Sequence, residues 1–500
     1  YAYNNYHMSY IVNRGDSPTS SGYFGKELFS KFVADVENGT NLAGEMGYPG
    51  LKSLYGYNGI NMIDNGDSMI TYISAADKTE MATVFLLAKG SITVKKNEKL
   101  DDWLVLPEIY TDEVIENIDS NAQVFESTFG TQEVVFQNVA DKAIIIDKLT
   151  ACGYEAVAFT PVAGAKFETL LFTNGMELVT VYWDSAKSEA RILFEKLDET
   201  VLSLLLPNAS TGTGELTMVQ VGVERGPGDT GNPMIGMCYV IKLSDGRAII
   251  IDGGFKYESN ADNVYNALSK LNIARNEDGQ YIIAAWFFSH GDSDHVGIME
   301  TFGKKYSEKA DVECFVFNLP SASQLLTPTS ATVERAFYEN CLAAYPNATF
   351  LTPRAGVQYF IGNATVDMLY TPDLVWSPES KITYYNSTSI VYKVNGGGVS
   401  FLSTGDAGES AFKVMWEKYE SGAFACDMFQ VPHHGLTTQN TEDGTGSYAA
   451  HGWTYIKKVY DATGAKYAVL PMGDRNPYDS RNGRSTVIVF WGNANCSISY

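Results

Sequence analysis

Two histidines and two aspartates fall within six consecutive residues of this 500-residue chain. They are His290, Asp292, Asp294 and His295, in the segment Ser-His-Gly-Asp-Ser-Asp-His. Imidazole nitrogens and carboxylate oxygens are ligands of divalent transition metals, so the pattern predicts a site for one or two such cations. A helix cap is the alternative: Asp292 would accept backbone N–H bonds at the start of a helix, and the histidines would have no shared role.

A strand must end where this cluster begins. Residues 281–288 are apolar at every position, which is typical of a strand covered on both faces. Residues 248–251 form a second apolar run, which follows a strand and an Asp245-Gly246 pair that predicts a two-residue type I′ hairpin turn. This run ends at Asp252 and two glycines. We expect Asp252 to support a metal ligand, or alternatively only to fix the turn.

Two further short strands are predicted to end in metal-capable side chains. Residues 399–404 precede Gly405 and Asp406, and residues 427–431 precede Pro432, His433 and His434. Asp406 is a candidate ligand, with capping of a helix at 407–419 as the alternative. The two adjacent histidines have no evident packing role. Several strands that each end in such a residue predict a site built on a rigid sheet, with its ligands on the loops.

The order of these motifs resembles the metallo-β-lactamase superfamily. His290-x-Asp292-x-Asp294-His295 is similar to the HxHxDH motif of that superfamily, with Asp at the second position. This variant resembles the metallo-β-lactamase domain of bacterial competence proteins for DNA internalisation. The resemblance covers approximately residues 216–500. Its further segments are 219–222, 239–254, 386–391, 401–406, 431–435 and 472–478.

The resemblance implies a fold and a reaction. The fold is an αββα sandwich of the α/β class, in which two mixed sheets face each other, helices cover the outside and the ligands lie along one edge. The reaction is hydrolysis, with a metal-bound hydroxide as the nucleophile. One cation would be held by Asp294, His295 and His433, and the other by His290 and Asp292, with Asp406 bridging the two.

The same resemblance implies further roles. Asp294 and His434 are the candidates for catalytic work, His434 through proton transfer or as an additional ligand. Asn386 lies in the segment that precedes the bridging aspartate, and we expect it to support a ligand together with Asp252.

The sequence departs from the superfamily pattern at one metal ligand. A further histidine usually lies between the first cluster and the bridging aspartate, yet no histidine occurs between residues 296 and 405. Asn318 is the nearest polar residue at a predicted strand end, so one cation site is expected to be weak or empty. The carboxylate of Asp292 shifts preference from zinc toward manganese, iron or magnesium, and we expect zinc and manganese equally. Asp479 stands where the competence-type pattern has histidine, which puts a catalytic role of that loop in doubt.

Charge restricts the substrate. The formal net charge is −23, with 59 acidic and 36 basic residues. Such a surface repels a polyanion, so long nucleic acid is a poor partner and a small molecule is expected. A small phosphodiester or phosphoester is the favoured substrate. The alternatives are a lactone or amide hydrolase of the same fold, and a binding or sensory protein whose metal site is vestigial.

The length of the chain predicts more than one domain. We expect an N-terminal α+β module of unknown role at 1–207, a small polar linker at 208–215 and the catalytic domain at 216–500. Within the module, residues 22–36 predict a helix and residues 69–95 predict strands.

The compartment and the assembly are less constrained. No apolar run approaches the roughly 18 residues that span a bilayer. The chain begins with Tyr1 rather than Met, so we expect that an N-terminal segment has been removed. We expect an extracellular or cell-surface protein, with the cytoplasm as the alternative. The oligomeric state stays open.

Overall fold

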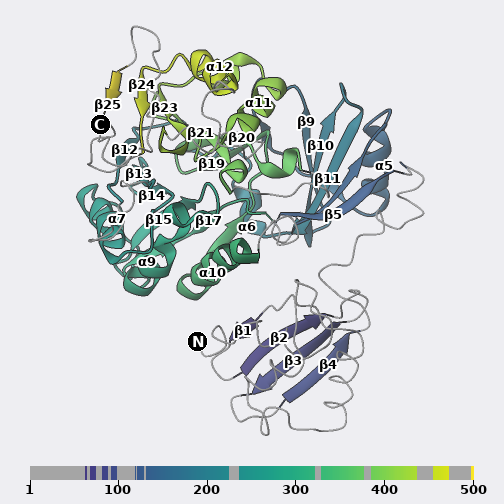
Figure 1. Cartoon of the computed structure of the whole chain (residues 1–500), viewed down its shortest axis with the longest axis horizontal. Coiled ribbons are helices and arrows are strands. Elements are labelled where there is room, and N and C mark those ends of the chain that lie inside the picture. Colours follow the sequence, from purple (N-terminus) through teal and green to yellow (C-terminus); the bar gives the residue numbers. More distant parts are fainter. Residues whose placement is uncertain are drawn as a thin grey trace. The chain divides into compact units, whose positions relative to one another are not determined.

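The computed structural model describes residues 62–64, 68–74, 81–87, 92–97, 119, 121–128, 131–223, 236–320, 328–376, 385–435, 454–471 and 497–499. The chain divides into two compact units, Tyr1–Pro107 and Glu108–Tyr500. The first contains an antiparallel sheet of the strands β1 (Met62–Asp64), β2 (Ser68–Ser74), β3 (Met81–Leu87) and β4 (Ile92–Asn97), paired in that order (Figure 1). The helix predicted at 22–36 lies outside the described residues.

Two mixed sheets form the centre of the second unit. One has the order β12-β13-β14-β15-β17-β18, with β16 also paired to β15, and the other has the order β25-β24-β23-β22-β21-β20-β19-β8. The strands of the first are β12 (Thr217–Gln220), β13 (Tyr239–Lys242), β14 (Ala248–Ile251), β15 (Tyr281–Phe287), β16 (Ala310–Val312), β17 (Cys314–Val316) and β18 (Thr349–Leu351). Those of the second are β8 (Thr160–Pro161), β19 (Val357–Ile361), β20 (Ala364–Tyr370), β21 (Val391–Gly396), β22 (Val399–Ser403), β23 (Met428–Gln430), β24 (Tyr467–Val469) and β25 (Ser497–Ser499).

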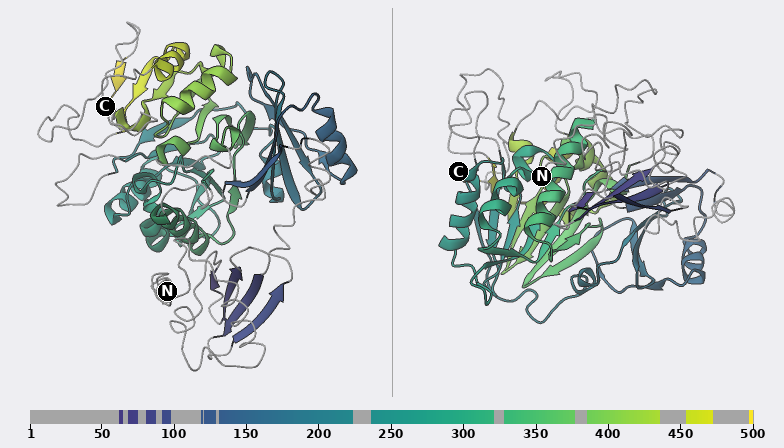
Figure 2. Two further views of the ribbon diagram at one scale, coloured as in Figure 1. Left: turned by 45° about the vertical axis from the view of Figure 1, so that its right-hand side comes forward. Right: turned by 90° about the horizontal axis from the view of Figure 1, so that it is seen from below.

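The two sheets face each other across a shared apolar core. Alternate side chains of each strand point to opposite faces, so Ile249 packs toward Tyr392 of the other sheet while Ile250 packs toward the helices. The helices α7 (Glu258–Lys270), α9 (Ile298–Tyr306) and α10 (Pro328–Ala344) cover the first sheet, and α11 (Glu409–Lys418) and α12 (Thr454–Thr463) cover the second (Figures 1 and 2). These four layers confirm the predicted α/β sandwich.

The turn before β14 differs from the prediction. Gly246 has a φ of 89° but Asp245 does not have a positive φ, whereas a type I′ turn needs positive φ at both positions. The N–H of Gly246 donates to Leu243 O, and the N–H of Leu243 donates to Arg247 O, which makes a longer loop. The Asp245 carboxylate accepts the N–H of Arg247 at 3.0 Å, and this side-chain bond favours the longer form.

A third sheet lies N-terminal to the sandwich within the same compact unit. Its order is β5-β6-β11-β10-β9-β7, all antiparallel, and the helix α5 (Ala143–Ala151) packs on one face. The strands are β5 (Gln123–Thr128), β6 (Thr131–Phe136), β7 (Glu155–Ala156), β9 (Glu168–Thr173), β10 (Glu177–Asp184) and β11 (Glu189–Lys196). Residues of the other face, including Leu178 and Leu193, belong to the sandwich cores.

The compact unit begins before the predicted linker. Residues 208–215 lie inside it, where Gly212 N–H donates to Asn363 O and the Asn363 amide donates to Thr213 O. Strand β8 also ties residues 160–161 to β19 in the sandwich. These contacts connect the third sheet to the sandwich, which composition alone does not reveal. The prediction that residues 216–500 form a domain of their own stays a prediction.

Among the described residues, no helix has both the length and the apolar character needed to cross a bilayer.

Candidate metal centre

Four strand ends meet at one edge of the sandwich and carry the predicted site residues. Asp252 follows β14, His290 follows β15, Asp406 follows β22 and the two histidines follow β23. The short helix α8 (Ser293–Val296) begins directly after Asp292 and carries Asp294 and His295. Loops at the same edge of the two facing sheets converge, so Asp294 and His434, which are 140 positions apart in the sequence, become neighbours.

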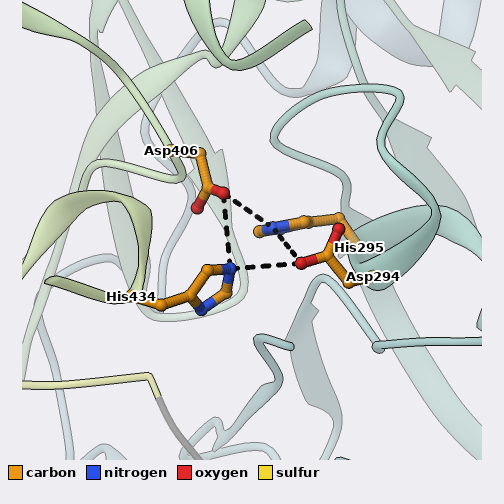
Figure 3. Close-up of side chains that lie close together, drawn as sticks. All are labelled: Asp294, His295, Asp406 and His434. Carbon is orange, nitrogen blue, oxygen red and sulfur yellow. Dashed lines mark ion pairs between the residues drawn. The ribbon is translucent and has the colours of Figure 1, made fainter. Parts of the chain in front are cut away.

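Four side chains form a buried quartet at this edge: Asp294, His295, Asp406 and His434. One ligand atom of each lies within 4.8 Å of the ligand atoms of the other three (Figure 3). Nε2 of His434 is 3.3 Å from Oδ2 of Asp406 and 3.3 Å from Oδ2 of Asp294. Nε2 of His295 is 3.3 Å from Oδ2 of Asp406 and 3.8 Å from Oδ2 of Asp294.

The nitrogen–oxygen separations in the quartet are close to those around a small cation. Zinc binds imidazole nitrogen and carboxylate oxygen at about 2.0–2.2 Å, and the corners of a tetrahedron with these bond lengths are about 3.3–3.6 Å apart. Three of the four His–Asp separations in the quartet are 3.3 Å, and the fourth is 3.8 Å. The four nitrogen–oxygen separations are therefore close to those around a single cation, and the nitrogen–nitrogen and oxygen–oxygen separations are no longer than 4.8 Å.

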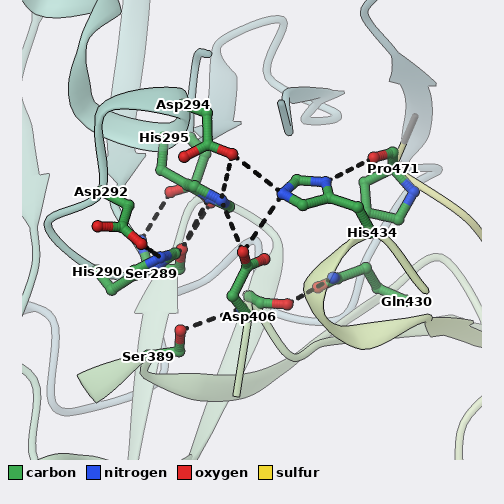
Figure 4. A network of polar contacts seen from close by, with 12 residues as sticks. Ser289, His290, Asp292, Asp294, His295, Ser389, Asp406, Gln430, His434 and Pro471 are labelled. Atoms are coloured by element: carbon green, nitrogen blue, oxygen red, sulfur yellow. Dashed lines mark hydrogen bonds and ion pairs between the residues drawn. The ribbon is translucent and has the colours of Figure 1, made fainter. Parts of the chain in front are cut away.

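The hydrogen bonds of the two imidazoles leave the correct nitrogen for a metal. Nδ1 of His434 lies 2.7 Å from the carbonyl oxygen of Pro471, which only accepts, so Nδ1 carries the proton. Nδ1 of His295 lies 2.7 Å from Oδ2 of Asp252 and donates to it (Figure 4). Nε2 of each ring is buried and makes no aligned hydrogen bond. Partners at the far ring nitrogen are the usual support of a metal-bound histidine.

The four side chains of the quartet shift one another's pKa values. Burial alone would raise the pKa of the Asp406 carboxyl, but His434 and His295 beside it hold that pKa well below its usual range. The same balance lowers the pKa of Asp294. Burial alone would lower the pKa of His295 and His434, but Asp406 and its neighbours raise the first well above its usual value and the second to about 10. A divalent cation can replace the charge of the two imidazole protons.

Asp406 is held in place by contacts around Gly405. The Gln430 side chain donates to Gly405 O at 2.8 Å, and the N–H of Asp406 donates to the Ser389 hydroxyl at 3.0 Å. Gly405 has a φ of 52°, and a Cβ there would come within 2.7 Å of Ser289 Cβ. Only glycine lets these two loops approach so closely.

His290 and Asp292 lie beside the quartet. Nε2 of His290 is buried and is 3.4 Å from Oδ2 of Asp292, and the His290 ring centroid is 4.2 Å from that of His295. Asp292 occupies the N-cap position of α8, but its side chain makes no capping hydrogen bond. The capping alternative therefore does not describe Asp292 in this structure.

His433 lies apart from the quartet in which the sequence placed it. Its Nε2 is 3.9 Å from Oδ2 of Asp406 and accepts a hydrogen bond of 3.2 Å from the Asn386 amide. His434, the candidate for proton transfer or an additional ligand, takes the position in the quartet. The reason is local backbone geometry: both residues have left-handed dihedral angles, with φ of 52° and 51°, and spacing in the sequence does not reveal which ring turns inward.

Asn318 and the segment after residue 471 remain to be placed. Asn318 is fully buried; its amide donates to Pro353 O at 3.1 Å and its Oδ1 has no hydrogen-bond partner. The segment 472–478 and Asp479 lie outside the described residues. Sequence reasoning missed Ser289 and the carbonyl of Pro471. The position of Ser289 before the motif was a usable signal, whereas a backbone carbonyl gives none.

Comparison with known proteins adds little to this description. No protein-family model matches the chain, and no curated protein matches it. The similar solved structures include Zn²⁺-bound PqqB from Methylobacterium extorquens, at 11% sequence identity and a TM-score of 0.34, with 52% of this chain and 90% of that chain covered. A TM-score this low carries no argument about ligand or reaction. The αββα layers therefore rest on the chain's own sheets and helices.

Proposed function

We propose that this chain is a metal-dependent hydrolase of the metallo-β-lactamase superfamily. The cation is held by the quartet of Asp294, His295, Asp406 and His434. One observation carries the proposal: two buried imidazoles direct their Nε2 atoms at two carboxylates, and three of the four N–O separations are 3.3 Å. Packing alone does not account for this cluster, because taking two carboxylates and two imidazoles out of water costs more free energy than burying apolar side chains of similar volume.

The ligand set favours zinc. Two imidazole nitrogens and two carboxylate oxygens suit zinc, and manganese is the second candidate because it prefers sites richer in oxygen. A bound divalent cation lowers the pKa of water and polarises a carbonyl or phosphoryl oxygen. The chain itself orients the ligands: Asp252 and the Pro471 carbonyl fix the two rings, and the Ser389 hydroxyl accepts from the Asp406 N–H.

The mouth of the site favours a small substrate of low charge. The side chain of Asp294 is 13% exposed and that of Asp292 is 38% exposed, whereas the other three quartet side chains are at most 3% exposed. Substrate therefore reaches the site past two carboxylates, which repel a dianion more strongly than a monoanion. We propose a small phosphodiester as the substrate, ahead of a phosphomonoester.

Metal analysis and a substrate panel test the proposal. Protein purified without chelator is expected to contain about one equivalent of zinc or manganese per chain. It is then assayed with Zn²⁺ or Mn²⁺ on bis-p-nitrophenyl phosphate, p-nitrophenyl phosphate, a lactone and a β-lactam. The diester should be cleaved fastest. Activity confined to the lactone or β-lactam would overturn the substrate class, and bound metal without any turnover would favour the binding protein.

A matched variant tests the role of the quartet. Asp406→Asn keeps the shape of the side chain but removes its charge, so metal binding and turnover should both fall. Asp427→Asn changes a partly exposed aspartate that pairs with Lys466 outside the site, and it should leave both unchanged. Full activity in Asp406→Asn would reject the mechanism.

A further inference from the structure

The strongest unexplained contact beside the quartet involves Ser289. This residue is fully buried between β15 and the metal-ligand loop. Its hydroxyl lies 3.0 Å from Nδ1 of His290 (Figure 4). It donates to Oδ2 of Asp252 at 2.7 Å and is 3.3 Å from Nδ1 of His295, which has a shorter contact of its own, 2.7 Å, with Asp252. The backbone N–H of Ser289 donates to the other carboxylate oxygen of Asp252, also at 2.7 Å. Ser289 therefore connects the Asp252 carboxylate to the imidazole of His290, in addition to the direct contact of Asp252 with His295.

The direction of each hydrogen bond follows from proton counting. A carboxylate only accepts, so the single hydroxyl proton of Ser289 points at Asp252. Toward His290 the hydroxyl oxygen can then only accept. Nδ1 of His290 must carry a proton to make that bond, and a neutral imidazole then has its lone pair at Nε2.

We infer that Ser289 sets the tautomer of His290. Its hydroxyl proton is donated to Asp252, so its oxygen can only accept a hydrogen bond from Nδ1 of His290. Asp252 fixes His295 directly, at 2.7 Å, and His290 through the serine hydroxyl. One buried carboxylate thus orients two histidines, with Nε2 of His295 directed at the quartet and Nε2 of His290 directed at Asp292. Ser289 is a positioning residue, and it touches neither cation nor substrate.

The surroundings of His290 agree with this assignment. Its Nε2 is buried without a hydrogen-bond partner and is 3.4 Å from Oδ2 of Asp292. The opposite tautomer would set the Nδ1 lone pair against the oxygen of Ser289. His290 can bind a second cation only if the lone pair is at Nε2. The biological meaning of the inference therefore rests on the proposed metal function, whereas its test needs no metal.

Nitrogen-15 NMR of histidine side chains in the metal-free full-length chain tests the inference. Long-range correlations distinguish the Nδ1–H form from the Nε2–H form, and His→Gln variants assign the signals. In the wild type, His290 should be in the Nδ1–H form, whereas His295, whose pKa is raised by the carboxylates around it, should carry a proton on both nitrogens. In Ser289→Ala, His290 should move to the Nε2–H form that histidine prefers in water, whereas His295 should keep its form because its direct bond to Asp252 remains.

Two further variants make the experiment decisive. Ser389→Ala removes a buried hydroxyl that also adjoins Gly405 but contacts the Asp406 backbone instead, so His290 should stay Nδ1–H. If Ser289→Ala does not fold, Ser289→Cys replaces it, since a thiol of similar shape accepts hydrogen bonds weakly. An unchanged His290 signal, or an equal change in both histidines, overturns the inference.

A zinc titration of the same proteins separates this inference from the proposed function. Loss of the serine hydroxyl removes the orienting partner of His290, the candidate ligand of a second cation, so the affinity for a second equivalent of zinc should weaken about tenfold. If the wild type binds no zinc, the proposed function fails while the tautomer measurement still decides the role of Ser289.

Discussion

The adjacent residues His433 and His434 place their imidazole rings at different distances from the aspartates of the quartet. Nε2 of His434 lies 3.3 Å from both aspartates of the quartet, whereas that of His433 lies 3.9 Å from Asp406 and is occupied by the Asn386 amide. The two rings have opposite pKa shifts: burial lowers the pKa of His433, while the neighbouring carboxylates outweigh burial and raise that of His434. Sequence position alone cannot separate two such neighbours.

Substitution of the two histidines should therefore have unequal effects. His434→Gln removes a donor of the quartet, and we expect zinc affinity to fall by roughly a hundredfold or more. His433→Gln should lower it by less than about tenfold, the range of a supporting contact. Competition titration with a chromogenic chelator measures both. The reverse order would return His433 to the place that the sequence analysis gave it.

The left-handed backbone of His433 leads to a second expectation. Both His433→Gly and His433→Ala remove the ring, but only glycine adopts a φ of 52° without strain. The glycine variant should be more stable than the alanine variant by about 1 kcal/mol. Urea unfolding of the metal-free proteins gives the difference. His290 does not have a positive φ, so His290→Ala should be more stable than His290→Gly. If the alanine variant is the more stable one at both positions, backbone strain at His433 is excluded.

Much of the candidate metal site could be predicted because its metal-capable side chains directly follow the ends of apolar strands. The apolar run 281–288 became β15 (Tyr281–Phe287), and the cluster after it reaches the same edge as Asp252 and Asp406. What the sequence could not show is long-range backbone geometry. The ring of His434 is fixed by the carbonyl of Pro471, 37 residues away, and a carbonyl has no sequence signal.

At the scale of elements, a buried ionic network joins the third sheet to the sandwich. Arg354, after β18, pairs with Asp373 and lies 3.0 Å from Glu195 of β11. Arg191 of β11 lies 3.1 Å from Glu133 of β6 and donates to the carbonyl of Trp376. Such networks need every partner, because a buried charge that loses its counter-charge is strongly destabilising.

Glu133 gives this network a pH dependence. Burial raises the pKa of Glu133 to about 8, although Arg191 opposes that shift. Between about pH 4.5 and 8 the folded chain keeps a proton that the unfolded chain has lost, so the stability contributed by this group falls as pH rises. The loss approaches about 1.4 kcal/mol per pH unit. Urea unfolding from pH 5 to 8 should show wild type losing stability relative to Glu133→Gln.

A surface variant controls for general charge effects. Glu155 of β7 is exposed, so the stability difference between Glu155→Gln and wild type should not change over the same pH range. Parallel pH curves for wild type and Glu133→Gln would mean that Glu133 is ionised in the folded chain.

At the scale of the whole molecule, the third sheet and the sandwich should unfold together. Arg354→Met removes the cation beside Glu195 and Asp373, and we expect a loss of about 3–5 kcal/mol. Hydrogen exchange followed by mass spectrometry should show β10 and β15 destabilised alike, since both belong to the compact unit that begins at Glu108. If exchange accelerates in β15 while β10 is unaffected, the third sheet is independent and the predicted division at 208–215 holds.

The short strand β8 has a consequence for how the protein is made. Thr160 and Pro161 pair with Gln358 and Val357, which are synthesised about 200 residues later. At ribosomal speeds of about 5–20 residues per second, the partner strand is missing for roughly 10–40 s. During this interval the apolar face that carries Leu178 and Leu193 lacks its sandwich partners. We therefore expect the nascent chain to need chaperones during this interval, and slower translation before residue 357 should raise aggregation more than slower translation after it.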